Sequence, residues 1–127
     1  MLSQNERKRI IALINREVVP AIGCTEPIAV ALCTARAAEL LGSRPEKVAV
    51  RLSANILKNA MGVGIPGTGM IGLPIAVALG ALVGRSEYQL EVLRDVTPEA
   101  TMDACDRNVP GIAEASAANS SIRFIST

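Results

Sequence analysis

Apolar residues recur at helical spacing at the start of the chain and again after a short interruption. The first pattern predicts a helix over residues 3–19, and Ser3 with Glu6 forms a capping-box pattern at its start. The second pattern predicts a helix over residues 25–41, which Gly42 ends. Because this second helix is apolar on nearly every face in its first half, we expect it to be central and buried.

A different pattern follows, because residues 47–53 alternate between apolar and polar side chains, as in a half-buried strand. We expect a short helical turn over residues 54–60 and a glycine-rich loop over 61–72. Pro74 then opens a helix that reaches Val83. Small residues recur every four positions in this region and would let another helix approach closely. They are Gly72, Ala76, Gly80 and Gly84.

The last third of the chain predicts two further helices, over residues 87–94, which Ser86 caps, and over 97–107. Residues 109–120 are expected to be irregular or weakly helical, and residues 121–126 are expected to form a strand that pairs with the one predicted above. No internal repeat is present. The sequence therefore predicts a single domain of the α+β class, mostly helical with one small sheet.

The composition argues against nucleic-acid binding and membrane insertion. The net charge is +1, charges of both signs alternate, and Tyr88 and Phe124 are the two aromatic residues, so a basic patch and a base-stacking platform are both missing. Residues 60–84 carry no charge and are long enough to span a bilayer. However, the glycines and prolines in this stretch would leave backbone groups unsatisfied in lipid. We expect neither a nucleic-acid partner nor a membrane segment.

The cysteines and the missing histidine limit the available chemistry. The chain has three cysteines and no apolar leader after Met1, so we expect a cytoplasmic protein without disulfides. With no histidine, neither a Ser-His-Asp triad nor a His-based metal site can be built from these residues. Chemistry must then use thiolate, carboxylate, amine or backbone groups, or a cofactor.

Cys24 is the sharpest candidate for chemistry. It comes immediately before the second predicted helix, which Thr25 is expected to cap. Free N–H groups and the helix dipole at this place stabilise a thiolate, which attacks electrophiles and binds iron or zinc. The alternative is that Cys24 has no chemical role and is a small apolar side chain that fills space beside a loop. Cys33 and Cys105 show no CxxC spacing, and we expect both to be inert, buried hydrophobes.

The glycine-rich loop and the turn before it are further candidates. Residues 67–72 fit GxGxxG, but no βαβ unit surrounds them. Residues 62–68 resemble a phosphate loop, but its lysine is missing, so we do not expect nucleotide binding at either segment. The loop's free N–H groups suit an anion such as a carboxylate, and close backbone packing is the alternative. Lys58 shares one side of a helical turn with Asn55. It could bind a carboxylate, act as a base if desolvated, or simply be solvated.

Three segments read together resemble one known family. They are residues 23–29, 55–63 and 65–76, which read GCTEPIA, NILKNAMGV and IPGTGMIGLPIA. In order and spacing they are similar to the amino-terminal region of the L-cysteine desulfidase family, also described as serine dehydratase-like alpha-subunit proteins. The resemblance covers most of residues 8–108.

The resemblance implies a PLP-independent lyase with an oxygen-labile [4Fe–4S] cluster held by three cysteines. Its reaction would be β-elimination from L-cysteine to pyruvate, ammonia and sulfide, or from L-serine to pyruvate and ammonia. The family's first cluster cysteine falls on Cys24. We assign the catalytic role to Lys58. The expected substrate-binding residues are Thr25, Asn55, Asn59, Gly67 and Thr68.

Relatives in that family are longer, and the resemblance places their other cluster ligands downstream of this region. Because one thiolate cannot hold a cluster alone, we expect an inactive amino-terminal fragment that binds no cluster by itself. Its partners would be a small amino-acid substrate, the missing carboxy-terminal portion or a partner chain, and further copies in a homo-oligomer. Two alternatives stay open: a non-catalytic module for amino-acid or anion binding or for assembly, and a thiol enzyme that uses Cys24 alone.

Overall fold

The computed structural model describes residues 1–45, 48–106, 112–115 and 122–124. The fold is α+β, as predicted, with helices forming most of its regular structure. In chain order the elements are α1 (Gln4–Glu17), α2 (Thr25–Leu41), β1 (Val48–Leu52), α3 (Ala54–Ala60), β2 (Gly64–Ile65), β3 (Met70–Ile71), α4 (Leu73–Val83), the 3₁₀ helix η1 (Ser86–Glu91), α5 (Pro98–Asp106), β4 (Ile112–Ala115) and β5 (Ile122–Phe124).

β1 is the middle strand of a three-stranded sheet with the order β4-β1-β5. It runs parallel to β4 and antiparallel to β5, where Val48 lies opposite Phe124. This confirms the predicted pairing of the chain's last strand with residues 47–53. Val48, Val50 and Leu52 are buried, as the alternation predicted. A second sheet of two short strands, β2 and β3, lies inside the glycine-rich segment, where the sequence predicted only a loop.

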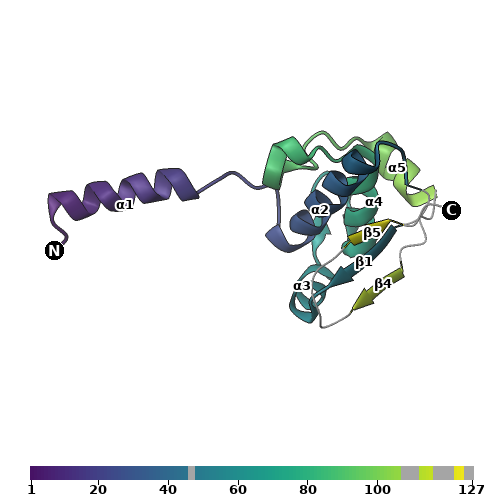
Figure 1. Cartoon of the computed structure of the whole chain (residues 1–127), viewed down its shortest axis with the longest axis horizontal. Coiled ribbons are helices and arrows are strands. Elements are labelled where there is room, and N and C mark those ends of the chain that lie inside the picture. The colour runs from purple at the N-terminus through teal and green to yellow at the C-terminus, as the bar shows by residue number, and fades with distance from the viewer. Residues whose placement is uncertain (46–47, 107–111, 116–121, 125–127) are drawn as a thin grey trace.

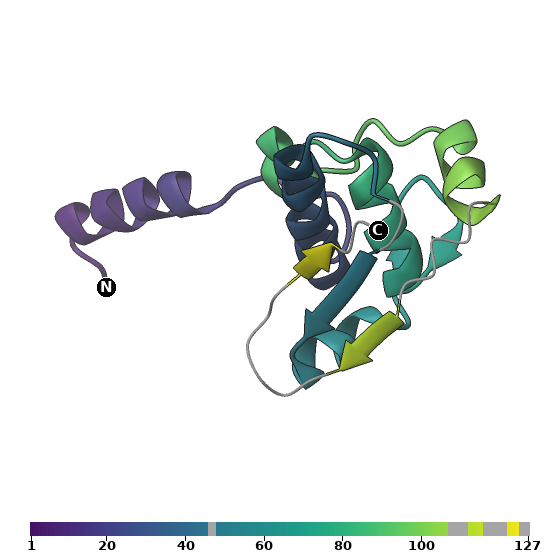
Figure 2. The same cartoon turned by 45° about the vertical axis from the view of Figure 1, so that its right-hand side comes forward.

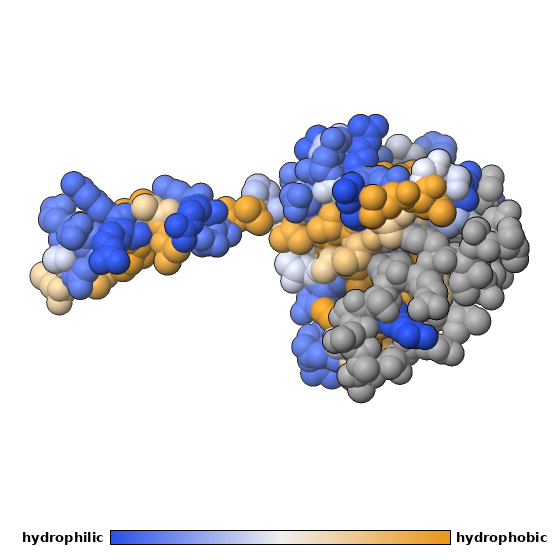
Figure 3. Space-filling view, in the orientation of Figure 1, coloured by the Kyte–Doolittle hydropathy of each residue, from blue (hydrophilic) through white to orange (hydrophobic). Residues whose placement is uncertain are grey.

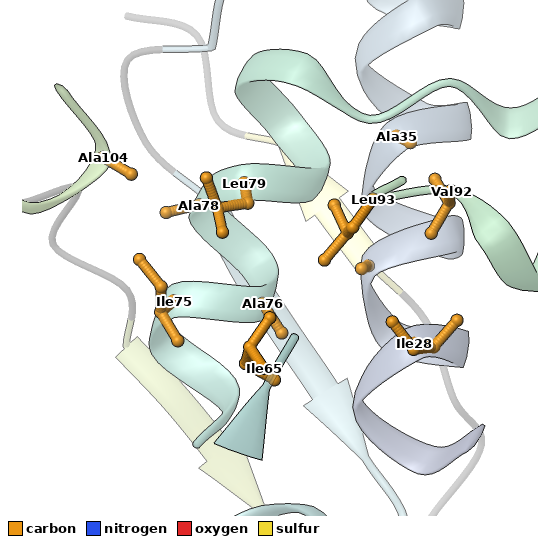
Figure 4. Close-up of a cluster of buried hydrophobic side chains, with 11 residues drawn as sticks. Ile28, Ala35, Ile65, Ile75, Ala76, Ala78, Leu79, Val92, Leu93 and Ala104 are labelled. Carbon is orange, nitrogen blue, oxygen red and sulfur yellow. The ribbon is translucent and has the colours of Figure 1, made fainter. Parts of the chain in front are cut away.

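α2 and α4 pack against each other at the centre of the molecule, with short aliphatic side chains between them (Figure 4). A Cβ added to Gly80 would lie 2.5 Å from the carbonyl oxygen of Ala31, and one added to Gly84 would lie 2.8 Å from the Cβ of Ala35. Two of the four small residues predicted to admit a neighbouring helix, Gly80 and Gly84, therefore lie at the contact with α2, whereas Gly72 lies against the Met61 carbonyl. The prediction that α2 is central is also confirmed.

α1 extends away from the rest of the molecule, as two views show (Figures 1 and 2). Its start has the predicted capping box: the Glu6 N–H donates to Ser3 Oγ at 3.2 Å, and the Ser3 N–H donates to Glu6 Oε2 at 2.7 Å. Every residue from 1 to 20 is exposed. Local capping therefore supports this helix, and packing against the body does not.

Two predicted segments differ in the structure. The helix expected over 87–94 is instead the short 3₁₀ helix η1, interrupted at Gln89, whose φ is 52°. The physical reason is that Ser86 does not cap this segment, because its hydroxyl and its N–H both donate to the Glu39 carboxylate of α2. Within residues 109–120, expected to be irregular or weakly helical, Ile112–Ala115 is strand β4, because it pairs with β1.

None of the helices in the described part of the chain combines the length and the apolar character needed to cross a membrane. The uncharged stretch of residues 60–84 forms the β2–β3 hairpin and the 11-residue helix α4.

Candidate functional site

The site is built around the start of α2. Cys24, rather than Thr25 as predicted, is the N-cap residue, and its side chain makes no capping hydrogen bond. Gly23 before it has a φ of +79°, and a Cβ there would lie 2.6 Å from the Pro66 ring. Only glycine fits both the left-handed backbone and this close contact. The contact brings the glycine-rich segment against the residue that precedes Cys24.

The carboxylate of Glu26 connects the candidate residues. Cys24 Sγ donates to Glu26 Oε2 at 2.9 Å, and the Thr25 hydroxyl approaches the same oxygen at 3.4 Å. Asn59 Nδ2, from α3, donates to Glu26 Oε1 at 3.3 Å. A thiol, a hydroxyl and an amide therefore converge on one carboxylate, and the amide comes from a separate helix.

These contacts set the charge of the cluster. The hydrogen bond from Cys24 is the main cause that holds the pKa of the Glu26 carboxyl below its ordinary value of 4.5, and the Glu26 backbone N–H adds to it. Burial acts in the opposite direction but is weaker, and the side chains of Asn59 and Thr25 contribute smaller amounts. Glu26 is therefore ionised at neutral pH.

The same geometry bears on the thiolate that the sequence suggested for Cys24. In the structure, Cys24 Sγ is a hydrogen-bond donor to the Glu26 carboxylate. The helix terminus favours negative charge, and at this terminus Glu26 carries it.

Asn59 is the predicted residue of α3 that the structure brings into the cluster. Asn55 and Lys58 are exposed, and successive helix positions differ in direction by about 100°, so Lys58 does not share the direction of Asn59. The Lys58 side chain is exposed and makes no hydrogen bond or ion pair to any described residue. Its catalytic role stays a prediction.

Gly67 and Thr68 form the turn of the β2–β3 hairpin. The φ of Gly67 is +78°, in the left-handed region. The Thr68 hydroxyl donates to the Ile65 carbonyl at 2.7 Å and accepts from the Met70 N–H at 3.0 Å. Thr68 thus closes the turn, while the backbone N–H of Gly67 bonds to no described residue.

The other two cysteines are exposed rather than buried as expected. Cys33 lies on the surface of α2, and Cys105 Sγ lies 3.2 Å from Met70 Sδ. Among the described residues, no three His, Cys, Asp or Glu side chains form a group that could hold a metal ion.

The sequence patterns did not single out Glu26, which is the centre of the site. The local signal was a cysteine and a carboxylate two residues apart at a helix start. The contact with Asn59 spans 33 positions and has no local signature.

The fold and site together define an α+β chain with a thiol–carboxylate–amide cluster at a helix start. The chain is similar to several bacterial proteins named UPF0597 protein. It is 79% identical over 99 residues to one from Bacteroides fragilis, covering 78% of this chain and 23% of that protein. It is 76% identical over 103 residues to one from Phocaeicola vulgatus, covering 81% and 24%. With one from Porphyromonas gingivalis it shares 60% identity over 103 residues, with the same coverage of 81% and 24%.

The chain thus spans about a quarter of the length of these relatives. No protein-family model matches it, and no solved structure gives a significant match.

These findings correct the expected family. The relatives are named UPF0597 protein, a name that states no activity, and not L-cysteine desulfidase or serine dehydratase alpha subunit. The prediction of a [4Fe–4S]-dependent lyase depended on that resemblance and is withdrawn with it. In the part of the chain that the structure describes, no group of metal-binding side chains supports the iron–sulfur assignment of Cys24.

Proposed function

We propose that the Glu26 cluster binds a small molecule that carries a protonated amine, such as a free amino acid. The observation that supports this is the ionised, half-buried Glu26 carboxylate, held in place by donors from two helices. A fixed carboxylate is a good counter-ion for an ammonium group, because a hydrogen bond between two charged groups is about twice as strong as one between neutral groups.

Thr25 marks the position where the amine would enter. Its hydroxyl is exposed and makes the longest contact with Glu26, at 3.4 Å. An ammonium group can displace this weak donor and leave the bonds from Cys24 and Asn59 in place. The Cys24 thiol then stays beside the ligand as a hydrogen-bond donor to Glu26.

The turn of the β2–β3 hairpin offers a complementary group for the carboxylate of an amino acid. Pro66 lies against Gly23, so the turn is anchored beside the start of α2. The next residue, Gly67, has an exposed backbone whose N–H bonds to no described residue. Exposed backbone N–H groups in such turns bind anions.

Titration of the full chain with L-alanine, followed by NMR, tests the proposal. We expect shifts of the Cys24, Thr25 and Asn59 signals with wild type, and at least tenfold weaker binding with Glu26→Gln, which keeps the side-chain size and removes the charge. Glu87→Gln, an exposed substitution on η1, is the matched control and should bind like wild type. Ethylamine and propionate separate the contributions of the two ends of the ligand. Saturable binding that Glu26→Gln leaves unchanged, or no binding by wild type, would reject the site.

We also propose a cytoplasmic location. Cys24, Cys33 and Cys105 are all free thiols, and a reducing compartment keeps thiols in this form. Cell fractionation with an antibody to the chain tests this, and recovery in a secreted fraction would contradict it.

A further inference from the structure

Two sulfur atoms from different elements meet on the surface of the molecule. Cys105 Sγ, in the last turn of α5, donates a hydrogen bond to Met70 Sδ of β3 at 3.2 Å. The two residues are 35 positions apart in the chain, and the β2–β3 hairpin lies beside α5 (Figure 2). Cys105 is exposed and Met70 is 38% exposed, so the contact is open to solutes.

A third sulfur lies one turn earlier on α5. Met102 precedes Cys105 by three positions, which places both side chains on the same side of the helix. Met102 is 65% exposed. By contrast, the apolar side of α1, orange in Figure 3, consists of Ile, Leu and Ala side chains and carries no sulfur. Of the chain's three cysteines and four methionines, three residues therefore gather around this one contact.

The ligand chemistry of these residues favours a soft metal ion. Thiolate and thioether sulfurs suit Cu(I), whereas zinc sites are built from Cys, His, Asp and Glu side chains. No three side chains of those four kinds form a group in the described part of the chain. Cu(I) accepts fewer ligands than zinc does, and it takes thioethers. We propose that Cys105 and Met70 bind Cu(I), with Met102 as a third sulfur ligand.

The two sulfur atoms lie closer together than they would around a bound ion. A metal–sulfur bond is about 2.3 Å long, so two sulfurs on opposite sides of one ion are up to about 4.6 Å apart. Binding therefore needs the pair to open by roughly 1 Å, which the exposed and flexible Met70 side chain permits. Each metal–sulfur bond uses a sulfur lone pair, and Cys105 releases its proton to solvent as the ion binds.

The charges around Cys105 favour a cation. The last turn of α5 has no basic residue, and the carbonyl groups at a helix C-terminus carry partial negative charge. Asp106, the next residue, is an exposed carboxylate. Arg44 reaches α5 from outside, but it is engaged in an ion pair with Asp103.

The contact also separates Cys105 from the other exposed cysteine. Cys33, on α2, makes no hydrogen bond to another sulfur among the described residues, so it offers an ion a single ligand. At Cys105 the second sulfur is already in place, and its bond to the ion forms within the same molecule. We therefore expect Cys105 to bind the ion at least tenfold more tightly than Cys33 does.

Anaerobic titration of the full chain with Cu(I), in competition with the chromophoric chelator bicinchoninate, tests the site. We expect one tightly bound ion per chain in wild type. Cys105→Ser should weaken binding by roughly 100-fold, and Met70→Leu, which removes the sulfur at similar volume, by roughly tenfold. Cys33→Ser is the matched control and should bind like wild type. All three side chains are exposed, so the fold is retained, as circular dichroism would check.

NMR of the methionine methyl groups locates the ion, with Ag(I) as a soft probe that does not change its oxidation state. We expect Ag(I) to shift the Met70 and Met102 signals and to leave that of Met1, before the start of α1, unchanged.

Three results would overturn the proposal. The first is a wild type that takes up neither ion. The second is binding that Met70→Leu leaves unchanged, because the ion would then use the Cys105 thiol alone. The third is an ion that sedimentation velocity finds only in dimers, where it joins thiols of two chains. Neither Cys24 nor Glu26 takes part in this site, so its test is independent of amine binding at the Glu26 cluster.

Discussion

At the scale of single residues, the carboxylate of Glu26 connects two helices that are separated in sequence. It accepts hydrogen bonds from Cys24 in its own segment and from Asn59 of α3, 33 positions away. Each bond involves a charged acceptor, so each depends on the carboxylate being ionised. Protonation would weaken both contacts at once, and the cluster is therefore sensitive to acid.

The pH dependence of stability tests this coupling. The pKa of Glu26 in the folded state lies below 4.5, chiefly because of the hydrogen bond from Cys24, so folding favours the deprotonated form. The stabilising contribution is therefore complete above the unfolded pKa of 4.5 and is lost as the pH falls through the lower folded value. We expect urea unfolding to show wild type more stable than Glu26→Gln at pH 7, with the difference shrinking below pH 4.5. A difference that is constant from pH 7 to about pH 3 would contradict the assignment.

Gly23 is the residue whose backbone places Cys24 beside the hairpin. Gly23→Ala must accept a φ of +79° and a Cβ that lies 2.6 Å from the Pro66 ring. The left-handed strain alone costs about 1–2 kcal/mol, so we expect a loss of about 2 kcal/mol or more in the free energy of unfolding. Gly62→Ala is the control, because a Cβ there meets no atom within 4 Å. Equal effects of the two substitutions in urea denaturation would show that the Pro66 contact is unimportant.

At the scale of helices and strands, close backbone packing replaces large side chains. α2 and α4 approach each other at Gly80 and Gly84, where no Cβ fits between the helices. Because the chain has only two aromatic residues, small aliphatic side chains must fill the core, and dispersion contacts are effective only when the helices are close.

Gly80→Ala tests this packing. Alanine is favoured over glycine in a helix by up to about 1 kcal/mol, which acts to stabilise α4. The new Cβ would lie 2.5 Å from the Ala31 carbonyl oxygen and 2.9 Å from its Cα, and backbone atoms cannot move aside cheaply. Overpacking costs about 1–3 kcal/mol, so we expect a net loss of about 1–2 kcal/mol in thermal or urea unfolding. A stabilised variant would mean that the helices separate easily.

The elements that the sequence predicted well are those set by local pattern. The periods of α1, α2 and β1, the caps at Ser3 and Gly42, and the small-residue stripe of α4 are all readable within a few residues. The secondary-structure predictions that were wrong concern segments whose structure depends on residues far away in the sequence. η1 is not an α-helix because Ser86 bonds to Glu39, 47 positions away, and β4 forms only by pairing with β1.

At the candidate site, too, local sequence patterns do not show which residues distant contacts bring together. Cys24 was identified from residue type and position and Asn59 through the family resemblance, and both lie in the cluster. Lys58 was identified in both ways and is exposed. Neighbours on one turn of α3 point in different directions, and only the packing of α3 against α2 decides which of them faces Glu26.

At the scale of the whole molecule, two clusters of buried side chains share α2 and α4. One extends toward η1 and α5, and the other extends toward β1 and α3. Both clusters depend on the same helix pair, so we expect the body to unfold as one cooperative unit. α1 contributes to neither cluster, and its stability is therefore independent of the body.

Limited digestion with trypsin tests this division. Arg16 lies in the last turn of α1, where every neighbouring residue is exposed, while Arg36 lies mid-helix in α2 over the packed core. Cleavage requires local unfolding, which costs little in an unsupported helix and nearly the full stability of the body in α2. We expect cuts on α1 at least tenfold faster than the cut after Arg36, as resolved by mass spectrometry over time. Cleavage of α2 as early as α1 would show that the body lacks the cooperative core described above.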